Sequence, residues 1–82
     1  MSKLLNLTIA TPEGIIFQGE VTKVKLPGKM GNFMVLPMHA PLISSLSSGK
    51  ISYEYKNELS ELLIKGGFVE INKDVISTCV EI

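Results

Sequence analysis

Apolar side chains recur mostly at every second position in several stretches, which is the period of a β-strand with one buried face. The rows are Leu5, Leu7, Ile9; Val24, Leu26; Ile51, Tyr53, Tyr55; Leu62, Ile64; and Ile76, Thr78, Val80, Ile82. Segments rich in glycine, proline, asparagine or serine separate these rows, and no long stretch has a helical period. The pattern therefore predicts an all-β chain, folded as an antiparallel sandwich or a small barrel.

The segment from Ile15 to Leu26 is too irregular to be one flat strand. Val24 and Leu26 share a face, but Val21 is out of phase with them. We therefore expect a bulge or a bend between Gly19 and Lys23, which lets the chain pass between two sheets.

Further local predictions concern two turns and a serine-rich stretch. Asn57-Glu58 is expected at a hairpin tip, and Asn72–Asp74 at the last turn. Because Ile43 and Leu46 anchor the serines of Ser44–Ser48, we expect a packed loop or a single helical turn there. The chain is long enough for one domain, residues 1–82, with one modest core.

The run from Val35 to Leu42 interrupts the alternation with two prolines and the single histidine, His39. Proline fixes φ, lacks an amide donor and favours extended geometry in the preceding residue, so this run cannot be a helix. We expect a stiff surface loop. His39 is expected to organise this loop by donating to a backbone carbonyl, a role that is compatible with partner contact.

Composition narrows the range of partners. Eight basic residues balance eight acidic ones, and no basic stripe is present, which disfavours nucleic acid as a partner. The single cysteine, Cys79, cannot form an intrachain disulfide and is interpreted as a structural strand thiol. The segment Met1–Leu5 lacks the apolar region of a secretory signal, and no apolar run has the length of a membrane span.

The chain offers little for enzyme chemistry. Its carboxylates are scattered over turns and polar strand positions, and His39 has no nucleophile-elbow motif to serve. One histidine and one cysteine cannot assemble a local metal site, and the glycines fit turns better than a phosphate-binding loop. We therefore expect no catalytic residue, no metal, no cofactor and no small-molecule substrate.

The order of motifs resembles the epsilon subunit of the F-type ATP synthase over nearly the whole chain. These motifs are Thr11-Pro12-Glu13, Phe17-x-Gly19, Val21-x-x-Val24, Gly28-x-x-Gly31, Leu36-Pro37-x-His39-Ala40-Pro41-Leu42, Gly49 and Gly66-Gly67. The P-x-H-A-P-L string is the most specific of them. The resemblance implies a β-sandwich of two five-stranded sheets, with about ten short strands.

The resemblance also implies a non-catalytic subunit of the central rotating stalk. It would bind the gamma subunit and the membrane rotor ring, and so couple ion translocation to ATP synthesis at the cytoplasmic face of a bacterial inner membrane. It would not insert into the membrane itself. By motif position, the gamma contact would include Thr11, His39, Ala40, Pro41, Leu42 and Ser44. The ring contact would include Lys29, Met30, Gly31, Asn32 and Phe33.

Two departures from the family pattern carry expectations of their own. The ring-facing turn is often acidic in relatives, whereas Lys29, Met30 and Asn32 stand here, so we expect an apolar ring contact through Met30, Phe33 or Met34. Relatives also commonly continue into a C-terminal helical hairpin that inhibits ATP hydrolysis. If 82 residues is the natural length, we expect that inhibition to be missing.

Two other classes of β-domain remain as alternatives. A lipoyl- or biotinyl-carrier domain would carry its modified lysine on an exposed hairpin, and Lys29-Met30 after Pro27-Gly28 fits that position. A small oligonucleotide-binding barrel would show aromatic residues interleaved with basic ones. Neither class explains His39-Ala40-Pro41-Leu42.

Overall fold

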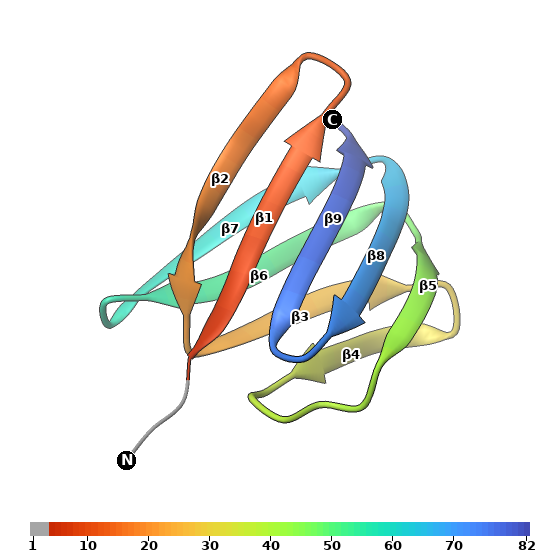
Figure 1. Ribbon diagram of the computed structural model, residues 1–82. Helices are drawn as coiled ribbons and strands as arrows, with labels where there is room; N and C mark the ends of the chain where they lie inside the picture. The colour runs from red at the N-terminus through yellow and green to blue at the C-terminus, as the bar shows by residue number, and fades with distance from the viewer. Residues whose placement is uncertain (1–3) are drawn as a thin grey trace.

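A computed structural model describes residues 4–82, which form β-strands joined by short turns (Figure 1). Nine strands are present in this part of the chain. They are β1 (Leu5–Thr11), β2 (Gly14–Val21), β3 (Lys23–Gly28), β4 (Gly31–Val35), β5 (Leu42–Leu46), β6 (Gly49–Tyr55), β7 (Glu58–Ile64), β8 (Gly66–Asn72) and β9 (Val75–Glu81). Residues 4–82 include no helix of the length and apolarity that crossing a membrane requires.

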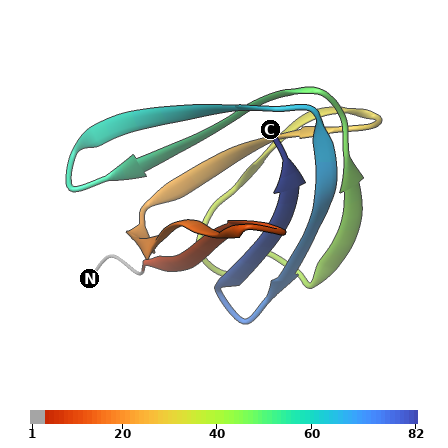
Figure 2. The same ribbon diagram turned by 90° about the horizontal axis from the view of Figure 1, so that it is seen from above.

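The strands form two layers that belong to one curled sheet. One layer has the order β2-β1-β9-β8-β5, and the other contains β3, β4, β6 and β7 (Figures 1 and 2). The layers join where Gly28 of β3 pairs with Leu46 of β5, and the Ser47 amide donates to the Pro27 carbonyl at 2.7 Å. The pairing is antiparallel throughout, except that β1 and β9 run parallel.

The prediction of an all-β sandwich is confirmed, with a difference in its details. The described residues form layers of five and four strands in a continuous sheet, rather than two separate five-stranded sheets. The expected bend is also present, because β2 ends at Val21 and β3 begins at Lys23, where the chain crosses to the other layer. The bulge lies elsewhere: Ile9 pairs with Phe17 and Ala10 with Ile15, so Ile16 is the extra residue.

The core lies between the layers and includes most members of the predicted alternating rows, together with residues outside those rows. Its buried hydrophobic members are Leu5, Leu7, Ile9, Val21, Val24, Leu26, Val35, Leu46, Ile51, Ile64, Val69, Ile71, Ile76 and Val80. Thr78 is buried with them, and its hydroxyl donates to the Thr8 carbonyl at 2.8 Å. Ile82 was predicted wrongly as a core residue. It is exposed because the last cross-strand pair, Gly66 with Glu81, precedes it.

Two local predictions are corrected. The serine-rich stretch is a loop only in part, because Ser44–Leu46 belongs to β5 and pairs with β8, whereas Ser47 and Ser48 connect β5 to β6. The tip of the β6–β7 hairpin is Lys56-Asn57, one residue before the predicted position. Both tip residues have positive φ, at 50° and 65°, as a two-residue type I′ turn requires. The last turn, between Asn72 and Val75, lies as predicted.

Candidate partner-binding surfaces

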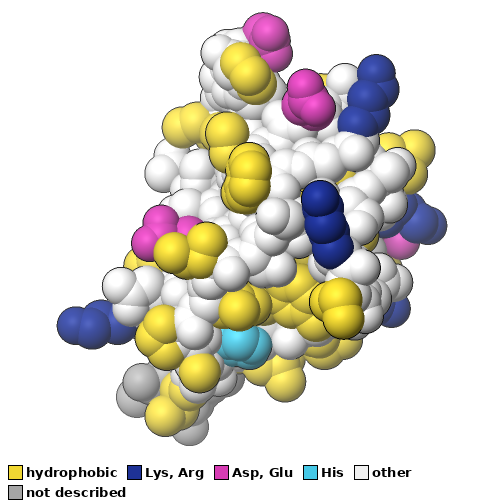
Figure 3. Space-filling view, turned by 90° about the vertical axis from the view of Figure 1, so that its right-hand side faces the viewer, with side chains coloured by type: hydrophobic (Ala, Val, Ile, Leu, Met, Phe, Trp, Pro, Cys, Tyr) yellow, Lys and Arg dark blue, Asp and Glu magenta, His cyan; other side chains and the backbone are white. Residues whose placement is uncertain are grey.

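The proline-rich loop, residues 36–41, connects β4 to β5 at one end of the sandwich (Figure 1). Leu36, Met38, Ala40 and Pro41 are exposed along it. In Figure 3 hydrophobic side chains surround the histidine, His39, on this side of the molecule. Because a stiff loop loses little backbone entropy when a partner covers its exposed apolar side chains, the loop is well suited to protein contact.

His39 organises the loop as predicted. Its Nδ1 lies 2.6 Å from the Ala40 carbonyl oxygen, which can only accept, so Nδ1 is the donor. Its backbone amide donates to the Leu36 carbonyl at 3.2 Å and closes a turn. The imidazole is half-buried, so part of it stays available to a partner.

Met38 adopts an unusual backbone conformation within this turn. Its φ is 71°, which lies in the left-handed region that residues other than glycine and asparagine rarely adopt. The Met38 amide donates to the Asp74 carboxylate at 2.6 Å, across 36 residues of sequence. This bond ties the loop to the β8–β9 turn.

The structure brings together only part of the predicted gamma-contact set. His39, Ala40 and Pro41 lie on the loop, and Leu42 begins β5 next to them. Ser44 follows on β5 opposite buried Val69, so its side chain faces the interior side of the sheet. Thr11 lies apart from this group, since it ends β1 at the end of the sandwich opposite the loop (Figure 1). Its hydroxyl donates to the Gly14 carbonyl and accepts from the Glu13 amide, which closes the β1–β2 turn.

The predicted ring-contact residues form the β3–β4 hairpin tip. Lys29 and Met30 are the two turn residues between paired Gly28 and Gly31, and Met30 is fully exposed. Asn32 is exposed on β4, whereas Phe33 is half-buried and packs against the core. Of the three apolar residues proposed to touch the ring, Met30 is therefore the most accessible, followed by Met34.

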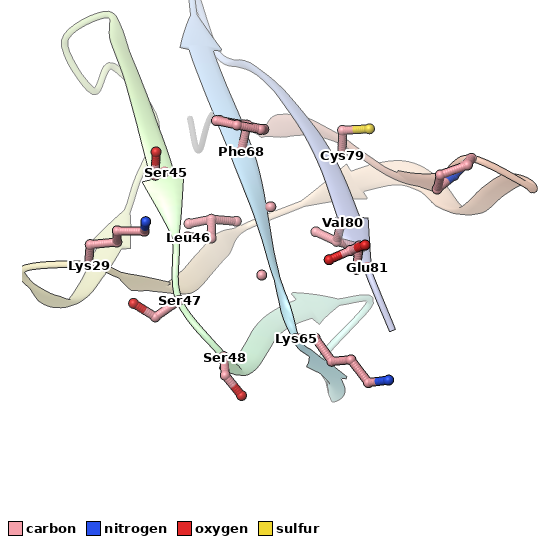
Figure 4. A pocket seen from close by; sticks show the side chains of 13 residues that line it. Lys29, Ser45, Leu46, Ser47, Ser48, Lys65, Phe68, Cys79, Val80 and Glu81 are labelled. Carbon is pink, nitrogen blue, oxygen red and sulfur yellow. The ribbon is translucent and has the colours of Figure 1, made fainter.

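A shallow groove on the outer face of β5, β8 and β9 was not predicted from the sequence. Figure 4 shows Phe68 and Cys79 beside it, with Lys29 and Lys65 at opposite sides. Phe68 is 63% exposed and Ile43 is 76% exposed on this face. Both residues are out of phase with the buried rows of their strands, and that antiphase is the signal that could have revealed the groove. Cys79 lies on a strand as predicted, but its thiol is exposed.

The polar side chains of residues 4–82 show neither a metal-ligand cluster nor a buried unpaired atom. In residues 4–82 no cluster of three histidine, cysteine, aspartate or glutamate side chains is arranged to hold a metal ion. Every buried side-chain nitrogen or oxygen in that range has a hydrogen-bond partner. The described residues thus form a β-sandwich domain with two exposed loops, at residues 36–41 and at the β3–β4 tip.

Comparison with known proteins places this domain in a family. Residues 4–82 match the family model described as the β-sandwich domain of the ATP synthase delta/epsilon chain. The chain therefore belongs to this family, which excludes the carrier-domain and oligonucleotide-binding alternatives.

Relatives with assigned names agree with this family. The chain is 47% identical over 77 residues to an ATP synthase epsilon chain of Campylobacter jejuni (strain RM1221), covering 93% of this chain and 60% of the relative. It is 36% identical over 73 residues to that of Leptospira borgpetersenii, covering 89% of this chain and 58% of the relative. The chain thus spans about three fifths of the length of these relatives. The expected absence of hairpin inhibition stays a prediction.

Solved structures share the fold. A chain of the Euglena gracilis mitochondrial ATP synthase, from a structure of the OSCP, F1 and c-ring, aligns with a TM-score of 0.88 at 24% identity. The alignment covers 94% of this chain and 50% of that one. A chain of the Tetrahymena thermophila central stalk and c-ring aligns with a TM-score of 0.82 at 14% identity, covering 99% of this chain and 66% of that one.

Proposed function

We propose that this chain is the β-sandwich domain of a non-catalytic central-stalk subunit of an F-type ATP synthase. In this role it binds the gamma subunit and the membrane rotor ring, at the cytoplasmic face of a bacterial inner membrane. The match of residues 4–82 to the family's β-sandwich domain carries the proposal. The domain transmits torque by being stiff, and it performs no chemistry itself.

The loop at residues 36–41 is the proposed gamma contact. Met38 and Leu36 project apolar side chains that are 77% and 50% exposed, on a backbone that prolines and His39 hold in shape. Because such a loop is ordered before binding, little conformational entropy is lost on docking. Leu42 adjoins this surface at the start of β5, where it is half-buried against the core. Thr11 lies too far along β1 to share one continuous contact with His39.

The hairpin tip at Lys29 and Met30 is the proposed ring contact. The tip projects from the two-strand ladder of β3 and β4, and Met30 has no neighbour that shields it from solvent. Lys29 adds a cationic group in place of the acidic residues common in the family. We therefore propose a mainly apolar ring contact, whose affinity depends weakly on salt.

A pull-down with purified gamma subunit tests the first contact. His39→Ala removes the bond to the Ala40 carbonyl, and Pro41→Ala frees the loop backbone. Lys25→Ala, on the outer face of the second layer, is the matched control. We expect both loop variants to bind gamma at least about fivefold more weakly, while the control binds it as tightly as the original chain. Folded loop variants that bind as well as the original would remove the loop from the interface, and an original chain that never binds gamma would contradict the proposed function.

A further inference from the structure

We infer that Asp74 is a positioning residue, which holds the proline-rich loop in the conformation that binds gamma. The inference rests on the proposed function, because the loop is the proposed gamma contact. It joins two segments that are 36 residues apart, the β8–β9 turn and the loop between β4 and β5.

Asp74 is itself held in place from two directions. Lys73 and Asp74 form the two-residue turn between paired Asn72 and Val75, with φ of 51° and 64°. This is the type I′ geometry that keeps antiparallel strands in register. The Asp74 carbonyl also accepts from the Asn6 amide at 2.8 Å, at the start of β1. The carboxylate therefore projects from a backbone that β1, β8 and β9 fix together.

The carboxylate holds the loop at its most strained residue. Its Oδ1 accepts from the Met38 amide at 2.6 Å, a charge-assisted bond at a residue with φ of 71°. Other bonds made by residues 36–41 remain inside the loop: His39 amide to Leu36 carbonyl, and His39 Nδ1 to Ala40 carbonyl. Among residues 4–82, the bond to Asp74 is thus the one that ties the middle of the loop to the sandwich.

This bond also determines where the apolar side chains of the loop point. A left-handed Met38 reverses the chain direction, so Leu36 and Met38 project outward on either side of a proline. Without the bond, Met38 can return to ordinary backbone conformations and the loop samples many shapes. Gamma would then bind only those molecules whose loop has the binding conformation. Its apparent affinity would fall in proportion to the fraction of molecules in that conformation.

Three variants separate loop positioning from turn stability. Asp74→Gly keeps the positive φ of the turn and removes the acceptor. Asp74→Asn keeps both the positive φ and an Oδ1 acceptor, without the charge. Lys73→Gly makes the same change of flexibility one residue earlier in the same turn, and serves as the matched control. Thermal unfolding of each full chain verifies that it is folded.

Two measurements are made on each variant: hydrogen exchange at the Met38 amide, and affinity for purified gamma. We expect Asp74→Gly to accelerate Met38 exchange at least about tenfold and to weaken gamma binding about tenfold. In Asp74→Asn, both the Met38 exchange rate and the affinity for gamma should stay close to those of the original chain. In Lys73→Gly, both should stay within about twofold of the original. Core amides such as that of Val69 should keep their protection in all variants.

Several outcomes would overturn the inference. Unchanged Met38 exchange in Asp74→Gly would show that the carboxylate does not hold the loop. Faster exchange with unchanged gamma affinity would show that loop order is irrelevant to binding, and would leave the proposed function standing. Equal losses in Lys73→Gly and Asp74→Gly would assign the effect to the turn instead. Failure of the original chain to bind gamma would contradict the proposed function and this inference together, while the exchange data would still report on the bond.

Discussion

Gly67 occupies a position on β8 that no other residue can occupy without damage. Its φ is +153°, and a Cβ atom built there would lie 2.3 Å from the Cys79 carbonyl oxygen and 2.9 Å from the Val80 Cα. Both of these atoms belong to the backbone of β9, which pairs with β8 along its whole length. A methyl group at Gly67 therefore cannot be accommodated by turning a side chain, and the two strands must separate.

The cost of Gly67→Ala can be worked from these numbers. Holding a residue with a side chain in this backbone region costs about 1–3 kcal/mol. Disturbing the β8–β9 ladder at Gly67 adds the loss of one or two hydrogen bonds, about 1 kcal/mol each. The expected loss is about 3 kcal/mol, against a total stability of about 4–12 kcal/mol for a chain of this size. The melting temperature should then fall by about 12–24 °C.

Gly66 supplies a control one residue away. A Cβ at Gly66 would meet only the Leu46 carbonyl oxygen, at 3.5 Å, which is ordinary contact. Gly66→Ala should therefore be neutral or slightly stabilising, since alanine also restricts the unfolded chain. Urea unfolding followed by far-ultraviolet circular dichroism measures both variants. A loss below about 1 kcal/mol for Gly67→Ala, or equal losses for both variants, would refute this account of the Gly66-Gly67 motif.

Three further predictions test separate features. Thr78→Val should lower the unfolding free energy by about 1 kcal/mol, because the Thr8 carbonyl loses a buried partner at 2.8 Å; a gain in urea midpoint would contradict this. Lys50→Ala should change stability by less than about 0.5 kcal/mol, because its 3.5 Å ion pair with Glu61 is exposed; a larger, salt-sensitive loss would argue for a stronger bridge. Met30→Ser should leave the urea midpoint unchanged and weaken binding to vesicles that contain the rotor ring, and ring binding by the original chain should depend little on salt. A steep salt dependence of that binding would indicate an ionic contact at Lys29 instead.

The alternating pattern predicted the core well where one face of a strand is apolar. Most members of the rows beginning at Leu5, Ile51 and Ile76 are buried or partly buried, because a period of two puts every second side chain on the same face. The pattern failed for β5, whose serines gave no such contrast. That strand exists because its backbone pairs with β8, a tertiary effect that local composition does not encode.

The overall closure of the sheet was also beyond a local pattern. β1 and β9 pair in parallel, although they lie at opposite ends of the described chain. Alternation predicts which face of each strand is buried, but it does not specify the neighbour. The same limit explains why the sequence predicted the loop at residues 36–41 and missed Asp74. Prolines and a histidine mark a stiff loop locally, whereas a hydrogen bond across 36 residues leaves no local signal.

The two proposed contact surfaces lie at opposite ends of one short strand. β4 begins at the hairpin tip with Gly31 and ends at Val35, just before Leu36 opens the proline-rich loop. Five extended residues span about 17 Å. Along this length β4 pairs with β3 at every position, from Gly28 with Gly31 to Val24 with Val35, and Val35 is fully buried. A force applied at Met30 therefore reaches the loop through the β3–β4 strand pair and the core. Bending β4 alone would break its hydrogen bonds to β3 and leave a cavity around Val35. Stiffness between the surfaces thus comes from this hairpin, and the bond from Asp74 to Met38 extends it into the loop.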